Sequence, residues 1–222
     1  MKLLLTDSGI TNPSIHNALV EMLDKPISES TALYIPTAMY THPGGSALVF
    51  RMLSGEDNSS PMTGLGWKSV AILELTALPS LDRSAWVPLV QEADVLLVAG
   101  GDAAYLAHWM RESGFADLLP TLDDTVYVGL SAGSMVLTPN VGREFISWPS
   151  RRADDTTLGI VDFGIFPHVN PPGEGGNSMA EAERWVASRT APAYVTDGQT
   201  AISVVDGKID VISEGEWRLF NG

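Results

Sequence analysis

Residues 125–133 read Thr-Val-Tyr-Val-Gly-Leu-Ser-Ala-Gly, and this stretch indicates both the fold and a candidate site. The apolar run at 125–128 predicts a strand, the pentapeptide at 129–133 follows it, and a short helical run comes next. A strand that turns sharply into a helix at a serine is typical of a nucleophile elbow, in which the flanking glycines permit a strained turn. A serine that caps a helix in a glycine-rich turn is the alternative interpretation of Ser131.

Strands and helices alternate through the chain that leads to this turn. The predicted strands cover residues 2–5, 31–35, 70–75, 95–99 and 125–128, and the predicted helices cover residues 13–23, 46–53, 83–92 and 103–113. Several strands are almost wholly apolar, which indicates burial on both faces. The pattern therefore predicts an α/β fold with a doubly wound, mostly parallel sheet and helices on both faces.

The pattern changes after Ser131. Residues 142–158 are polar and irregular, a strand is predicted at 161–167, a loop at 170–177 and a helix at 179–188. Alternating residues at 201–205 and 209–212, separated by Asp206-Gly207, predict a C-terminal β-hairpin. No repeat, low-complexity tract or linker interrupts the sequence, so we expect residues 1–222 to form a single α/β domain.

Composition narrows the class of protein. The 27 acidic residues against 13 basic ones give a net charge of −14, which argues against a nucleic-acid partner and against an anionic membrane surface. The absence of cysteine excludes disulfides and thiolate metal sites, and no H-E-x-x-H, Walker or G-x-G-x-x-G pattern is present. We therefore expect no metal and no cofactor. The short apolar run at 3–5 is interpreted as a strand rather than a signal sequence, so we expect a cytoplasmic protein.

A serine nucleophile needs a base that takes its proton. The chain has four histidines: His16, His42, His108 and His168. His168 comes directly after the predicted strand at 161–167, which places it with Ser131 at the carboxyl edge of the sheet, where ligands bind in such folds. His16 and His108 fall within predicted helices and are interpreted as surface or packing residues. His42 follows the second strand and could line a pocket.

The oxyanion of an acyl-transfer reaction needs fixed hydrogen-bond donors. The N–H of Ala132, at the start of the helix after the serine, is one candidate. Gly100-Gly101 follows a neighbouring strand, and its lack of side chains lets the backbone approach a substrate carbonyl closely. Asp102 is also predicted to cap the next helix, and the two roles of this turn are compatible.

Three motifs together resemble the peptidase E family, which includes aspartyl dipeptidases and cyanophycinases. They are Gly100-Gly101-Asp102, then Gly129-Leu-Ser-Ala-Gly133, then Phe166-Pro-His168, in the family's order and at similar separations, with a weaker echo at Val195-Thr-Asp-Gly-Gln199. The resemblance implies the fold of class I glutamine amidotransferases, in which a cysteine occupies the elbow. It also implies that Ser131 is the nucleophile, that His168 is the general base and acid, and that Gly101 and Ala132 bind the oxyanion.

Two departures from the family matter. An acid is usual between the serine and the histidine, but Ile146 stands where aspartyl dipeptidases carry it; we predict that the nearest acid, Glu144, orients His168, with Asp154, Asp155 and Asp162 further along. Aspartyl dipeptidases also resemble one another in an Arg after the histidine that pairs with the substrate carboxylate, whereas residues 170–179 contain no Lys or Arg. Arg151 and Arg152 could substitute for it, although a solvated pair is the simpler interpretation.

These observations predict a serine peptidase that cleaves dipeptides or other short peptides and has no aspartyl preference, acting as a monomer or a homodimer. A catalytically weak homologue that binds a small molecule or a peptide is the alternative. An esterase of the α/β-hydrolase class is disfavoured, because that fold brings its histidine from much later in the chain and no histidine follows His168.

Overall fold

The computed structural model of the chain describes residues 1–54, 60–149, 154–171 and 176–222. Within these residues the helices are α1 (Pro13–Leu23), α2 (Gly45–Ser54), α3 (Arg83–Glu92), α4 (Ala103–Glu112), α5 (Ala132–Met135) and α6 (Met179–Ala187). The helices predicted at 13–23 and 83–92 begin and end at the predicted residues. Helix α1 shows why: Pro13 stands in its first turn and the Asn12 side chain accepts from the N–H of Ile15.

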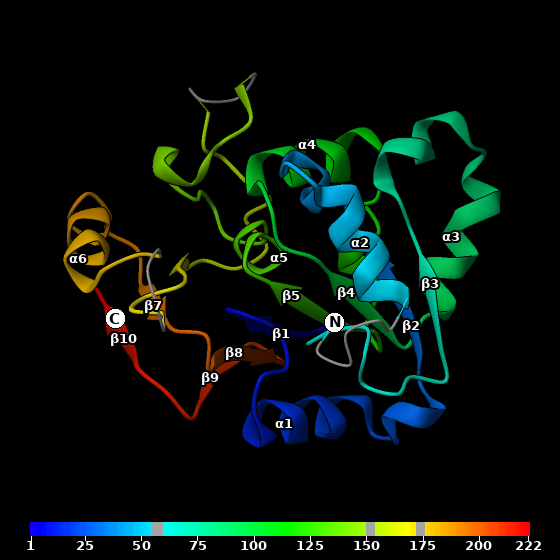
Figure 1. The fold of residues 1–222 in the computed structure, drawn as a ribbon, viewed down its shortest axis with the longest axis horizontal. Coiled ribbons are helices and arrows are strands. Elements are labelled where there is room, and N and C mark those ends of the chain that lie inside the picture. The colour runs from blue at the N-terminus through cyan, green and yellow to red at the C-terminus, as the bar shows by residue number, and fades with distance from the viewer. Residues whose placement is uncertain (55–59, 150–153, 172–175) are drawn as a thin grey trace.

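A main sheet in the order β3-β2-β4-β5-β1-β8-β9 forms the centre of the described part of the chain (Figure 1). Its strands are β1 (Lys2–Thr6), β2 (Thr31–Ile35), β3 (Ser69–Ile72), β4 (Val95–Val98), β5 (Val126–Leu130), β8 (Thr200–Val205) and β9 (Lys208–Ser213). Strands β1 to β5 are parallel, and the hairpin β8–β9 joins antiparallel to β1. The predicted fold class, including the C-terminal hairpin, is confirmed. Asp206 and Gly207 both have positive φ, as a tight hairpin turn requires.

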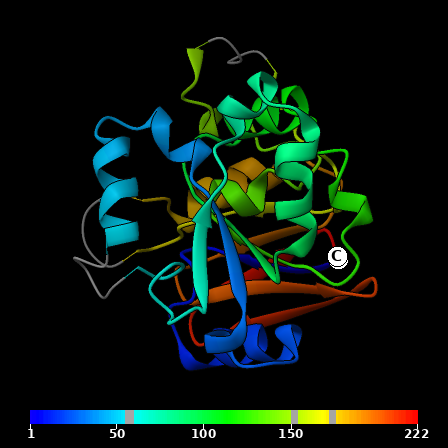
Figure 2. The same cartoon turned by 90° about the vertical axis from the view of Figure 1, so that its right-hand side faces the viewer.

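Successive residues of each strand face opposite layers, because side chains alternate across a sheet. Leu4 packs in the layer that contains α1 and α2, whereas Leu3 and Leu5 pack in the layer that contains α3, α4 and α5. Figure 1 shows α1 on one side of the sheet and α4 and α5 on the other, and Figure 2 gives the same arrangement after a quarter turn. Burial on both faces explains why the central strands β4 and β5 are almost wholly apolar, whereas the edge strands β3 and β9 are more exposed.

A second, three-stranded sheet lies on the side of the main sheet that carries β8 and β9, next to α6 (Figure 1). It consists of β6 (Gly164–Phe166), β7 (Ala193–Thr196) and β10 (Trp217–Phe220), with β6 parallel and β10 antiparallel to β7. The strand predicted at 161–167 is therefore shorter than expected, and β7 and β10 were not predicted. Each has four residues, too few to show a period of two.

The carboxyl ends of four strands meet near the middle of the molecule. Thr6 ends β1, Leu130 ends β5, Val98 ends β4 and Phe166 ends β6, so the residues that follow each strand come together there. Over the described residues, the helices are all too short or too polar to cross a membrane.

Candidate active site

Ser131 occupies a strained turn between β5 and α5. Its φ of 50° and ψ of −110° lie outside the regions that L-residues favour, which costs roughly 1–3 kcal/mol. The turn is held from β1: the Ser131 N–H and the Ser134 hydroxyl both donate to the carbonyl of Thr6, at 3.1 and 2.8 Å. Ser131 therefore lies in a strained turn at the edge of the sheet, which is the conformation that the elbow motif predicts.

Close packing behind the elbow explains one of its glycines. A Cβ on Gly133 would lie 2.1 Å from the carbonyl oxygen of Val98, so no larger residue fits. The buried Tyr127 hydroxyl donates to the Gly133 carbonyl at 2.6 Å. Burial raises the pKa of the Tyr127 phenol, so it remains a donor at neutral pH. The elbow is therefore built into the sheet rather than set in a loop.

His168 follows β6 of the three-stranded sheet and lies next to Ser131, which follows β5 of the main sheet. The distance from its Nε2 to the Ser131 Oγ is 2.8 Å. His168 has a φ of 60°, and its backbone is held on both sides: its carbonyl accepts from the N–H of Asn177, and the Asn177 amide donates to the carbonyl of Pro167. The imidazole therefore lies at the serine with its backbone restrained by the segment around Asn177.

Asp7, directly after β1, binds the other side of the imidazole. Its Oδ1 lies 2.7 Å from the His168 Nδ1, and its Oδ2 accepts from the His168 backbone N–H at 2.6 Å. The Thr196 hydroxyl donates to Oδ2 at 3.0 Å and the Ser8 hydroxyl to Oδ1 at 2.8 Å. The Asp7 side chain is fully buried, so these four donors replace its water. Ser131, His168 and Asp7 thus form a continuous hydrogen-bonded chain.

The Gly100-Gly101 turn after β4 lies beside the elbow. Gly101 has a φ of 140°, and a Cβ there would lie 2.0 Å from the carbonyl oxygen of Ala38, so only glycine fits. A Cβ on Gly100 would lie 3.4 Å from the Ser131 Cβ, which shows how near the turn is to the serine. Among the described residues, no hydrogen-bond acceptor pairs with the backbone N–H of Gly101 or of Ala132. Gly101 also lines the cavity at Ser131, whereas Ala132 is buried.

A cavity of about 320 Å³ opens on Ser131 and His168. Gly101 lines it, as do the apolar side chains of Ala103, Met135, Phe145 and Pro167. His42 and Asn177 are its further polar lining residues. Its volume is at the lower end of the range of about 300–1,000 Å³ for small-molecule sites.

The sequence as a whole matches the family described as Peptidase family S51 over residues 3–212. The chain belongs to peptidase family S51. The predicted resemblance to the peptidase E family is thereby confirmed, and membership of the family supports peptidase activity. No curated protein matches the S51 chain significantly.

Solved structures share the fold of this S51 chain. A protein from Listeria monocytogenes EGD-e that is described as a peptidase E protein matches with a TM-score of 0.68 and 18% identity, over 96% of this chain and 98% of that one. A peptidase from an acI-B1 Actinobacterium matches with a TM-score of 0.63 and 20% identity, over 97% and 88%. At these identities the likeness concerns the fold alone.

Glu144 does not occupy the place predicted for it. The carboxylate on the His168 Nδ1 is that of Asp7, whereas Glu144 is exposed, in a short 3-10 helix at Arg143–Phe145. Glu144 lines a neighbouring cavity, and its carboxylate turns back toward Gly142. The prediction assumed that the acid lies between the serine and the histidine in sequence. The fold supplies it from the first strand instead, because β1 pairs with β5 and ends beside the elbow.

One signal in the sequence could have found Asp7. It stands in Thr6-Asp7-Ser8-Gly9, directly after the first predicted strand, and polar residues at such strand ends gather at the ligand edge of a parallel sheet. What the sequence lacked was the strand order. Only the pairing of β1 with β5 places Asp7 next to Ser131 rather than several strands away.

The other three histidines lie where their positions in the sequence predict. His16 lies in α1, and His108 lies in α4 with its ring against Trp109 and Trp148. His42 lines the cavity at Ser131. Arg151 and Arg152, considered as partners of a substrate carboxylate, lie outside the described residues.

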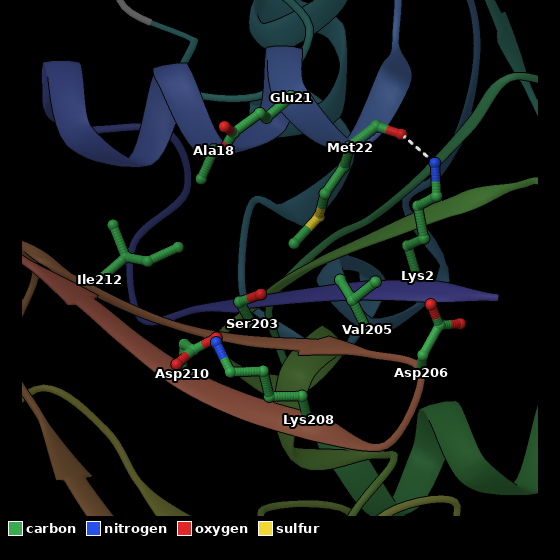
Figure 3. Close-up of a pocket in the computed structure, with 10 residues that line it drawn as sticks. All are labelled: Lys2, Ala18, Glu21, Met22, Ser203, Val205, Asp206, Lys208, Asp210 and Ile212. Carbon is green, nitrogen blue, oxygen red and sulfur yellow. Dashed lines mark hydrogen bonds and ion pairs between the residues drawn. The ribbon is translucent and has the colours of Figure 1, made fainter.

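A larger cavity, of about 650 Å³, lies away from Ser131, between α1 and the β8–β9 hairpin (Figure 3). Figure 3 shows Lys2 donating to the carbonyl of Met22, and Lys208 pairs with Asp210 at 2.7 Å. No histidine lines it. Within the described residues, no cluster of three metal-ligating side chains is present either.

Proposed function

We propose that this chain is a serine peptidase that cleaves short peptides through an acyl-enzyme on Ser131. The observation that carries the proposal is the hydrogen-bonded chain from the Ser131 Oγ through the His168 imidazole to the Asp7 carboxylate. A general base within hydrogen-bond reach of the nucleophile, itself oriented by a third group, is the arrangement that activates a serine.

The proposed reaction runs in two steps. The His168 Nε2 takes the proton as the Ser131 Oγ attacks the substrate carbonyl, and it returns that proton to the leaving amine as the acyl-enzyme forms. A water molecule then attacks the ester with His168 again as base, which releases the acid and the free serine. Asp7 keeps the proton on Nδ1, so that Nε2 faces the serine as an acceptor, and it stabilises the imidazolium.

The unpaired N–H groups of Gly101 and Ala132 are suited to bind the oxyanion of the tetrahedral intermediate, with Gly100 shaping the turn. Removing one such donor in other enzymes costs about 10²- to 10³-fold in rate. The elbow holds Ala132 near Ser131 and the turn after β4 holds Gly101 there before substrate binds, so these donors would need little reorganisation during the reaction.

The cavity size supports a dipeptide or other short peptide as substrate. The absence of Lys and Arg from residues 170–179 supports the lack of an aspartyl preference, because a buried carboxylate needs a charged partner. A cytoplasmic location and a monomeric or homodimeric state stay predictions, which cell fractionation and analytical ultracentrifugation would test.

Hydrolysis of a dipeptide panel and of aminoacyl p-nitroanilides by wild type, Ser131→Ala and Ser69→Ala tests the proposal. Ser69 is exposed on β3, away from the cavity, and serves as the matched control. We expect Ser131→Ala to lose at least about 10³-fold in kcat, because the acyl-enzyme cannot form, and Ser69→Ala to match wild type. Equal rates in all three proteins, with no fluorophosphonate labelling of Ser131, would instead favour a binding protein.

A further inference from the structure

The segment 195–199, a weaker echo of the peptidase E motifs in the sequence, connects the two sheets. Strand β7 ends at Thr196 in the three-stranded sheet, and β8 begins at Thr200 in the main sheet (Figure 1). Strand β7 pairs with β6, which leads to His168, and β8 pairs with β1, which leads to Asp7. The proposed base and its acid therefore follow strands of different sheets, and this segment joins the two.

Thr196 is hydrogen-bonded on both sides of this junction. Its hydroxyl donates to the Asp7 Oδ2 at 3.0 Å, and its carbonyl accepts from the N–H of Val169, directly after His168, at 3.0 Å. The same Asp7 oxygen accepts from the backbone N–H of His168 at 2.6 Å. Thr196, Asp7 and the His168-Val169 backbone thus form a closed ring of hydrogen bonds.

Thr196 is itself held firmly. The residue is 2% exposed, and a β-branched side chain has few accessible rotamers. The turn that follows it is fixed by the Asp197 carboxylate, which accepts from the N–H groups of Gln199 and Glu216 at 3.0 and 2.6 Å. A group whose own position is locked by packing and hydrogen bonds can hold its partner in a precise geometry.

The other hydroxyl on Asp7 is attached in a different way. Ser8 is the next residue in the chain and donates to Oδ1 at 2.8 Å, so it belongs to the same strand end as the carboxylate. Its contact does not connect Asp7 to the strand that carries His168. Thr196 comes from 189 residues away in the sequence and makes that connection.

We propose that Thr196 is a positioning residue, whose hydroxyl holds the Asp7 carboxylate against the His168 imidazole. This inference rests on the peptidase function proposed above. A hydrogen bond to a charged group is stronger than one between neutral groups, so its loss should loosen the carboxylate and the imidazole that it orients. Thr196 is not among the described residues that line the cavity at Ser131, so substrate binding should be little affected.

The experiment measures kcat and KM for dipeptides and aminoacyl p-nitroanilides in wild type, Thr196→Val, Thr196→Ser and Thr200→Val. Valine has nearly the shape of threonine without the hydroxyl, whereas serine keeps the hydroxyl. Thr200 is the matched control, because it is fully buried nearby and its hydroxyl donates to Asp197 at 2.8 Å rather than to Asp7.

We expect Thr196→Val to lose at least about tenfold in kcat, with KM within about twofold of wild type. Thr196→Ser should keep at least about half of the wild-type kcat, and Thr200→Val should match wild type in both constants. Both valine variants lose a buried hydroxyl, so the Tm of each should fall by about 2–4 °C. A purely structural role would therefore affect the two variants alike.

Proton NMR gives a second measurement that needs no substrate. The His168 Nδ1 proton, hydrogen-bonded to Asp7, is expected at low field, apart from the other imidazole protons. We expect this resonance to shift upfield or broaden in Thr196→Val, and to stay unchanged in Thr196→Ser and Thr200→Val.

An unchanged kcat and an unchanged resonance in Thr196→Val would overturn the inference, and so would an equal loss of kcat in Thr200→Val. Thr196→Ala gives the same comparison if the valine variant does not fold. Fluorophosphonate labelling of Ser131 separates the two proposals. A labelled serine with no effect of Thr196→Val overturns only the role of Thr196, whereas an unlabelled serine and full hydrolysis by Ser131→Ala overturn the peptidase mechanism as well.

Discussion

Asp7 and Asp102 are two buried carboxylates at the same edge of the main sheet, and they have different roles. Asp7 follows β1 and Asp102 follows β4, the two parallel strands on either side of β5. Both side chains are almost inaccessible and both collect several donors: His168, Thr196 and Ser8 on Asp7, and Tyr105, Ser147 and Trp148 on Asp102. Asp7 contacts the imidazole next to the nucleophile. Asp102 caps α4 and ties down the segment that carries Phe145.

The comparison shows that two carboxylates at one edge of the sheet can have separate roles, one in the proposed reaction and one in the position of a cavity wall. Asp7 acts on the ring nitrogen that sets the tautomer of His168, so its charge bears on the reaction itself. Asp102 accepts mainly from backbone N–H groups, so its charge bears on where a wall of the cavity lies. Replacing each carboxylate by an amide should therefore affect kcat in one case, and stability and KM in the other.

The largest effect is expected for Asp7→Asn. An amide at this position donates to Nδ1 and favours the wrong tautomer, which in a serine protease triad costs about 10⁴-fold in kcat. We expect a loss of about 10³- to 10⁴-fold in kcat with little change in KM, measured by steady-state hydrolysis. Circular dichroism of the variant checks the fold. A loss below about tenfold would contradict the assignment of Asp7 as the orienting acid.

An intermediate effect is expected for Asp102→Asn. One amide oxygen cannot replace a carboxylate that accepts from Tyr105 on one oxygen and from Ser147 and Trp148 on the other. We expect the free energy of unfolding to fall by about 1–3 kcal/mol, measured by urea denaturation, because buried donors lose their acceptor. KM should rise more than kcat falls, because Phe145 lines the cavity at Ser131. A kcat loss as large as that of Asp7→Asn would remove the distinction between the two carboxylates.

The smallest effect is expected for Glu144→Gln, at the acid predicted from the sequence. The residue is exposed and Asp7 already occupies the His168 Nδ1. We expect kcat/KM to stay within about twofold of wild type, since surface substitutions change little. Steady-state kinetics of Glu144→Gln, Asp7→Asn and wild type, measured under the same conditions, test this expectation. A tenfold loss would restore Glu144 as a candidate.

Local signals predicted much of this molecule and failed at identifiable points. The apolar strands, the capped helix α1 and the Asp206-Gly207 turn each depend on the residue types within a short stretch of sequence. They were therefore predicted close to their observed bounds. The strands β7 and β10 were missed, because their four residues carry little pattern and depend on pairing for their existence. The orienting acid was predicted wrongly as Glu144, because the prediction assumed that a residue close to Ser131 in the sequence also lies close to His168 in space.

By itself, the sequence determined the alternation of strands and helices, the glycines of two tight turns, and a serine and a histidine that each follow a strand. These are local properties, set by hydrophobic period and by backbone sterics. Only the tertiary structure decided which strand ends meet. The pairing of β1 with β5 brings Asp7, 161 residues before His168, to its imidazole, and the segment tied to Asp102 brings Phe145 to the cavity. Such contacts depend on strand order and long-range packing, which no short stretch of residues encodes.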